Sequence, residues 1–177
     1  CSSDEWVDTL LFIMSYIILY QGDVAKIEKM FIFYGPRGDE GKSLTSNLIS
    51  SFFSESQIQH FSASQLSNAF NLNYIASAKL CACDEFTISK RNPVNFDILK
   101  KLVSYSYLNG EVKGGRTVPF KNTCKLLFCT NDVSFLTEYG SSSVVRRLCI
   151  LEWNNQVKEE DKDPELIYKL INEKSGI

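Results

Sequence analysis

A glycine-rich loop near residue 40 constrains the fold of this chain more than any other feature. The loop reads Gly-Pro-Arg-Gly-Asp-Glu-Gly-Lys-Ser over residues 35–43 and follows the apolar stretch MFIFY at residues 30–34. The apolar stretch predicts a buried strand, and residues 42–53 predict a helix. A glycine loop that joins a buried strand to a helix beginning with Lys-Ser is typical of phosphate binding.

The loop residues have distinct expected parts in such a site. Glycines let the backbone turn its N–H groups toward phosphates, and the helix start adds the positive end of its dipole. Lys42 is expected to reach the β and γ phosphates of ATP, and the Ser43 hydroxyl is expected to bind Mg²⁺. A turn that binds nothing is the alternative. The predicted nucleotide-binding residues are Gly35, Pro36, Arg37, Gly38, Asp39, Glu40, Gly41, Lys42, Ser43 and Leu44.

One position departs from the usual spacing of such loops. The pattern G-x-x-x-x-G-K-[ST] requires a glycine at position 36, where this chain has Pro36. Gly35 comes one residue too early, so the loop is longer by one residue or begins differently. Gly41, Lys42 and Ser43 stay in register.

Polar side chains follow two further apolar stretches that predict strands. Asp84 and Glu85 follow residues 79–83, and Asn131 follows residues 125–130. Downstream of a phosphate loop, Asp84 is expected to hold Mg²⁺ and Glu85 to polarise the attacking water as a general base. An amide at the position of Asn131 is suited to hold that water and the γ-phosphate. Without the loop, each of these groups would be interpreted as an ordinary solvated turn.

The order of these stretches predicts an α/β fold with a central parallel sheet flanked by helices and a β-hairpin insertion. Helices are expected over residues 4–20, 24–29, 42–53, 64–70, 95–105 and 164–173, and a hairpin over residues 111–121 with its turn at Gly114-Gly115. A length of 177 residues suits one domain. We expect an N-terminal helical segment over residues 1–29, an ATPase core over 30–153, and a linker and helix over 154–177.

The charge balance limits how this chain can bind nucleic acid. Lys and Arg number 19 and Asp and Glu number 21, for a net charge of −2. A nucleic-acid contact must therefore be a local patch. Lys113 and Arg116 place two cations beside the Gly-Gly turn and are the predicted DNA-binding residues, with an ordinary solvated hairpin as the alternative.

The cysteines and the N-terminal apolar run bear on the compartment. Five of the six cysteines lie in apolar stretches, which is typical of buried reduced thiols and predicts an intracellular protein. The apolar run over residues 10–20 is too short to span a membrane and predicts a buried helix. Because the chain begins with Cys1, we expect it to be part of a longer protein.

The order of motifs resembles the superfamily 3 helicases, especially the primase-helicases of phages, plasmids and large DNA viruses. The resemblance covers about residues 30–153. It implies a P-loop NTPase of the AAA+ type that forms a hexameric ring and moves on single-stranded or forked DNA with ATP and Mg²⁺. The motifs that carry it are Gly38-Asp-Glu-Gly-Lys-Ser43, Asp84-Glu85, Leu108-Asn-Gly-Glu-Val-Lys113, Leu126-Leu-Phe-Cys-Thr-Asn131 and Val145-Arg-Arg-Leu148.

The resemblance also implies roles for several residues. Lys42 and Ser43 would form Walker A, Asp84 and Glu85 Walker B, and Asn131 the sensor. Arg147, or the adjacent Arg146, would be the arginine finger that enters the neighbouring subunit's ATP site. Lys113 would grip DNA in the ring channel, with Arg116 as a second candidate. Glu40 is a departure, because a small polar residue, often Asn, is common there.

These observations favour an ATP-dependent DNA helicase motor of a replication protein, with an upstream primase-like domain as a possible further part. The alternative is an assembly or initiator module that binds nucleotide and partners without unwinding. A small-molecule kinase or a GTPase is a third hypothesis, but Asn131-Asp132-Val133 is not the N-K-x-D motif of a GTPase.

Overall fold

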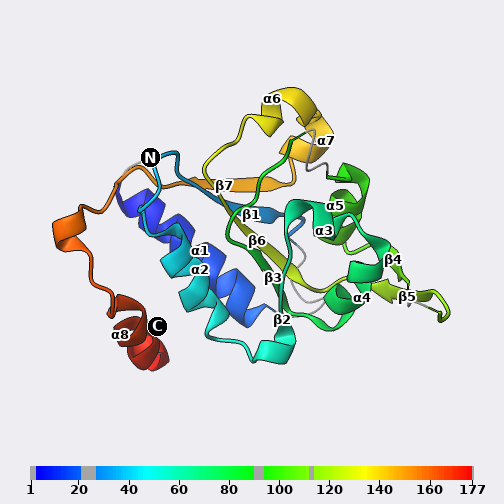
Figure 1. Cartoon of the computed structure of the whole chain (residues 1–177), viewed down its shortest axis with the longest axis horizontal. Helices are drawn as coiled ribbons and strands as arrows, with labels where there is room; N and C mark the ends of the chain where they lie inside the picture. The colour runs from blue at the N-terminus through cyan, green and yellow to red at the C-terminus, as the bar shows by residue number, and fades with distance from the viewer. Residues whose placement is uncertain (1–2, 21–26, 90–93, 112–113, 177) are drawn as a thin grey trace.

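The computed structural model describes residues 3–20, 27–89, 94–111 and 114–176. The described chain forms three layers, with a sheet between two layers of helices (Figure 1). The predicted α/β architecture with a central parallel sheet is confirmed. A separate two-stranded hairpin lies beyond one end of the sheet, as predicted for the insertion.

The central sheet has five strands in the order β2-β3-β6-β1-β7. All four neighbouring pairs are parallel, so the carboxyl ends of the strands meet at one edge, where α/β proteins bind ligands. Because β6 lies between β1 and β3, the residues that follow β6 lie between those that follow the other two. The strands are β1 (Met30–Tyr34), β2 (Ile58–His60), β3 (Leu80–Cys83), β6 (Lys125–Thr130) and β7 (Leu148–Glu152).

Alternate residues of each central strand point to opposite faces and build two cores. Met30 and Ile32 belong to the core under α3, α4, α5, α6 and α7, whereas Phe31 and Phe33 belong to the core under α1, α2 and α8. The helices are α1 (Ser3–Leu19), α2 (Lys42–Ser50), α3 (Ala63–Leu66), α4 (Ala69–Ser77), α5 (Phe96–Val103), α6 (Phe135–Tyr139), α7 (Ser142–Val145) and α8 (Leu166–Glu173), with 3₁₀ turns at Glu55–Gln57, Glu159–Asp161 and Lys174–Gly176.

The N-terminal apolar run forms a helix, as the sequence predicts, but only one of its faces is buried, because Leu11, Phe12 and Leu19 are exposed. Ile13 and Ile17 of α1 are fully buried against the sheet. The Lys125 ammonium at the start of β6 is also buried, and it donates hydrogen bonds of 2.7 Å to the Tyr105 hydroxyl and 3.1 Å to the Tyr16 hydroxyl of α1. In the part of the chain that the structure describes, no helix has the length and apolarity needed to cross a membrane.

Three local predictions differ from the structure or lie outside it. Residues 64–70 are not one helix, because α3 ends at Leu66 and Asn68 caps the separate helix α4 by accepting a hydrogen bond from the Phe70 N–H. The hairpin strands are β4 (Tyr107–Gly110) and β5 (Val118–Lys121), joined by residues 111–117, so the predicted two-residue turn is wrong. The helix predicted over 24–29 falls largely outside the described residues.

The described cysteines are free and mostly buried. Cys81, Cys83, Cys124 and Cys129 lie inside the two cores, and Cys149 is half-buried. Burial raises the pKa of Cys83 to about 11 and the pKa of Cys129 to about 12. These thiols therefore pack as neutral, apolar groups, as predicted.

We expect the free energy of unfolding to fall as the pH rises above about 9, the ordinary pKa of these thiols. The unfolded chain then loses thiol protons that the folded chain keeps until pH 11 to 12, and this difference favours unfolding. Urea midpoints at pH 8 and pH 10 measure the effect. A variant with both Cys83→Ala and Cys129→Ala should show a smaller fall, and an equal fall in that variant would contradict the prediction.

Candidate active site

The glycine loop joins β1 to α2 at the carboxyl edge of the sheet. Its start is fixed to β6, because the Gly35 N–H donates a 3.1 Å hydrogen bond to the Thr130 carbonyl. Gly38, Asp39 and Gly41 have positive φ angles of 80°, 54° and 92°. Left-handed residues in such a loop turn successive N–H groups toward the same side and make a concave site for an anion. Gly41 is thus required by the backbone conformation, and its αL geometry sets the start of α2.

A buried ion pair lies inside this loop. The Lys42 ammonium bonds the Glu40 carboxylate and donates a 2.9 Å hydrogen bond to the Gly35 carbonyl. The second Glu40 oxygen accepts a 3.0 Å hydrogen bond from the Arg37 N–H. Burial opposes ionisation of Glu40, but the bonds from Lys42 and Arg37 outweigh it, and the pKa of Glu40 is lowered. The Glu40 carboxylate is therefore ionised at neutral pH.

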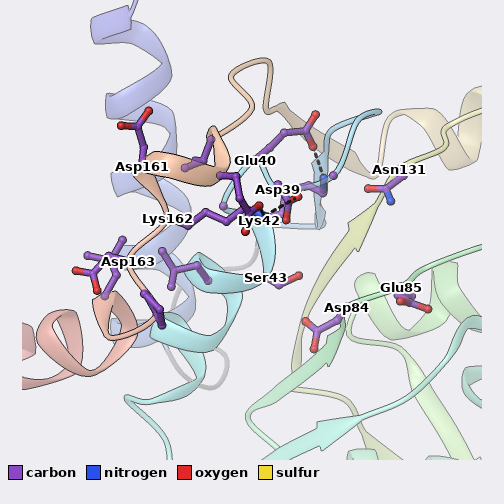
Figure 2. A pocket seen from close by; sticks show the side chains of 17 residues that line it. Asp39, Glu40, Lys42, Ser43, Asp84, Glu85, Asn131, Asp161, Lys162 and Asp163 are labelled. Atoms are coloured by element: carbon purple, nitrogen blue, oxygen red, sulfur yellow. Dashed lines mark hydrogen bonds and ion pairs between the residues drawn. The ribbon is translucent and has the colours of Figure 1, made fainter.

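The predicted acidic pair and Asn131 reach the same site from neighbouring strands. Asp84 and Glu85 follow β3, and Asn131 follows β6, which lies between β3 and β1. All three side chains are exposed and line one cavity with Ser43 at the start of α2, as Figure 2 shows. Ser43 and Asp84 offer oxygen ligands of the kind that Mg²⁺ prefers.

The cavity has a volume of about 690 Å³, which suits a nucleotide. Gly35, Pro36 and Arg37 are outside its lining, although Gly35 and Arg37 hold the buried ion pair. The predicted residues that the structure brings together around it are Gly38, Asp39, Glu40, Gly41, Lys42, Ser43, Leu44, Asp84, Glu85 and Asn131.

A C-terminal segment forms the opposite wall of the cavity, and the sequence analysis missed it. This segment comprises residues 157–166, which the sequence predicts to be a linker and the start of a helix. It lies beside the glycine loop. The Val157 N–H donates a 2.9 Å hydrogen bond to the Asp39 carbonyl, and the Lys162 ammonium lies 3.1 Å from the Asp39 carboxylate. No sequence signal identifies this wall, because its residues have an ordinary polar composition. Only folding brings them to the loop.

Trp153 supports the loop from the sheet side. Its ring lies 3.4 Å from the position that a Cβ of Gly41 would occupy, and it packs edge-on against Trp6 of α1 with ring centroids 4.9 Å apart. Both tryptophans are half-buried and pack against the core under α1, α2 and α8.

Comparison with known proteins places the chain in a family. Residues 33–147 match a family of unknown function, and this stretch contains the loop, the acidic pair and Asn131. The chain belongs to DUF5906. No curated protein matches the DUF5906 chain.

Solved structures with the same fold include helicase structures. The DUF5906 chain superposes on the NrS-1 C-terminal region with a TM-score of 0.67 at 23% identity, covering 97% of this chain and 43% of that one. It superposes on JCV helicase with a TM-score of 0.60 at 12% identity, covering 95% of this chain and 46% of that one. The DUF5906 chain thus spans less than half of either structure, and at these identities the likeness shows the fold.

The two arginines predicted as alternative fingers differ in their surroundings. The Arg147 guanidinium is largely buried and donates hydrogen bonds to the Ser104 hydroxyl at 3.0 and 3.1 Å and to the Ser143 carbonyl at 2.8 Å. Arg146 is exposed. Of these two arginines, Arg146 is therefore the one whose side chain faces solvent.

One of the two predicted DNA-binding residues lies in the described part of the hairpin. Arg116 is exposed in the connection between β4 and β5, and Lys113 lies outside the described residues. The start of the connection is fixed to α4, where the Asn73 amide donates to the Glu111 carbonyl and the Glu111 N–H donates to the Ala69 carbonyl. Arg116 is therefore presented to solvent on an anchored element of the DUF5906 chain.

Proposed function

We propose that this chain is the ATP-hydrolysing motor domain of a DNA helicase that works as a ring, as in superfamily 3. The observation that carries the proposal is the meeting of the Lys42-Ser43 loop, the Asp84-Glu85 pair and Asn131 at one cavity of nucleotide size. The fold shared with JCV helicase supports it.

The proposed reaction assigns a role to each group at the cavity. Glu85 takes a proton from a water molecule while the oxygen of that water attacks the γ-phosphorus of ATP. The bond between the γ-phosphorus and the oxygen that bridges it to the β-phosphorus breaks, which gives ADP and phosphate. Asn131 orients the water, and the Lys42 charge stabilises the phosphate oxygens. When bound by Ser43 and Asp84, Mg²⁺ supplies positive charge at the β and γ oxygens.

A ring of subunits completes the proposed motor. Arg146 of one copy reaches the γ-phosphate held by its neighbour and stabilises the charge that develops during hydrolysis. Arg116 on the hairpin contacts the phosphates of single-stranded DNA, and a ring repeats this contact with each subunit. A net charge of −2 per chain is compatible with such a local grip.

We expect Lys42→Ala to lower the affinity for Mg-ATP by at least about tenfold, because a charge-assisted contact to phosphate is lost. Calorimetry on the full-length protein measures the affinity. Lys101→Ala is the matched control, because it removes an exposed lysine on α5 outside the cavity. Equal affinity in the Lys42→Ala and wild-type proteins would contradict the nucleotide site.

The motor itself is tested by strand displacement on a forked duplex. The wild type should hydrolyse ATP faster with single-stranded DNA and unwind the fork, and Arg116→Ala should reduce unwinding more than ATP hydrolysis. ATP binding with no unwinding, and with hydrolysis unaffected by DNA, would instead favour the assembly module.

A further inference from the structure

We infer that the Glu40 carboxylate occupies the phosphate position of the loop, so that a nucleotide binds only after displacing it. The inference rests on the proposed nucleotide site and adds an internal competitor to it. The Glu40 side chain is completely buried, although residues on both sides of it line the open cavity.

The contacts of this carboxylate are those that a bound phosphate would make. One oxygen bonds the Lys42 ammonium, the group expected to hold the β and γ phosphates. The other accepts the Arg37 N–H at 3.0 Å, one of the loop N–H groups that a phosphate would receive. An anion from the chain itself thus satisfies the cationic side chain and a backbone donor of the loop.

The absence of a side chain at Gly35 makes room for this arrangement. A Cβ at this position would overlap the Glu40 carboxylate and would lie 2.8 Å from the Lys42 ammonium. Lys42 also donates to the Gly35 carbonyl at 2.9 Å, so its ammonium is directed into the loop. Only 7% of the Lys42 side chain is exposed to the cavity.

A phosphate and the Glu40 carboxylate cannot share this position. Both are anions, and the desolvated interior of the loop would strengthen their repulsion. The nucleotide must therefore bind the fraction of molecules in which Glu40 has left Lys42. Its apparent affinity is the affinity of the open loop multiplied by that fraction.

Measuring nucleotide affinity with and without the Glu40 charge tests the inference. Glu40→Gln keeps the side-chain shape and should bind Mg-ATP about tenfold more tightly than wild type, as expected if the open loop is populated at about one part in ten. Glu40→Ser is a second variant without the carboxylate. Glu160→Gln is the matched control, because Glu160 is 75% exposed and outside the cavity lining. Calorimetry on the full-length protein gives the affinities, and circular dichroism checks folding.

Tripolyphosphate as a second probe separates this inference from the proposed function. Tighter tripolyphosphate binding by Glu40→Gln, with no ATP binding by either protein, supports the competitor and contradicts the ATP site. Equal ATP affinity in the variants and the wild type overturns the competitor and keeps the ATP site. If no protein binds either probe, both ideas fall.

A measurement on the wild type covers the case in which the variants do not fold. The Arg37 amide resonance should shift when tripolyphosphate binds, because the hydrogen bond to Glu40 is replaced. Binding without such a shift overturns the inference.

Discussion

Glu85→Gln should lower the rate of ATP hydrolysis by about 10²- to 10⁴-fold, the usual contribution of a general base. Glu85 follows β3 directly and its exposed side chain lines the cavity beside Asn131. An amide keeps the size of the side chain but has no negative charge with which to accept the proton of the attacking water. Steady-state hydrolysis by the full-length protein, at saturating Mg-ATP, measures the loss.

Binding measurements distinguish this role from a structural one. The affinity of Glu85→Gln for Mg-ATP should stay within about threefold of wild type, because Glu85 acts on water and the phosphates are held elsewhere. Glu160→Gln, an acid-to-amide change at an exposed position outside the cavity, should leave the rate unchanged. A Glu85→Gln protein that hydrolyses ATP at the wild-type rate would exclude Glu85 as the base.

Phe86→Ala should lower the free energy of unfolding by about 3–5 kcal/mol, the typical cost of removing a buried aromatic side chain. Phe86 is fully buried, stacks on Phe128 with ring centroids 4.5 Å apart, and meets Phe135 edge-on at 6.0 Å. The lost area and the cavity left behind both destabilise the folded chain. Urea denaturation followed by circular dichroism measures the change.

Two variants control for the Phe86 result. Tyr168→Ala removes an aromatic side chain that is 68% exposed and should change the free energy of unfolding by less than about 0.5 kcal/mol. Phe86→Leu should cost less than Phe86→Ala, because it fills more of the cavity. Equal stability of Phe86→Ala and wild type would mean that the stacked rings do not hold in place the turn that follows β3.

The Phe86 contacts show how the fold positions the acidic pair. The Phe86 N–H donates a 2.8 Å hydrogen bond to the Cys129 carbonyl of β6, and its ring fixes the chain directly after Glu85. The sequence does not predict which ring or strand Phe86 contacts, because those partners are more than 40 residues away in sequence.

Much of the fold follows from local patterns in the sequence. Short apolar stretches that end in polar residues predict β1, β3 and β6 correctly, since an apolar run of four to six residues is typical of a strand buried on both faces. The hairpin turn and the helix over 64–70 were wrong because backbone propensity at Gly114 and Asn68 does not specify how far strands pair or where one helix gives way to another.

The sequence by itself determined that a glycine loop, an acidic pair and Asn131 follow three predicted strands, and this pattern predicts a site that binds and hydrolyses a nucleotide. Only the tertiary structure decided which further groups join them. Burial of Arg147 against Ser104 leaves Arg146 exposed, and residues 157–166 close the cavity. The buried Glu40–Lys42 pair depends on a loop conformation that leaves space beside Gly35. Such contacts arise from packing between distant segments, which no local pattern encodes.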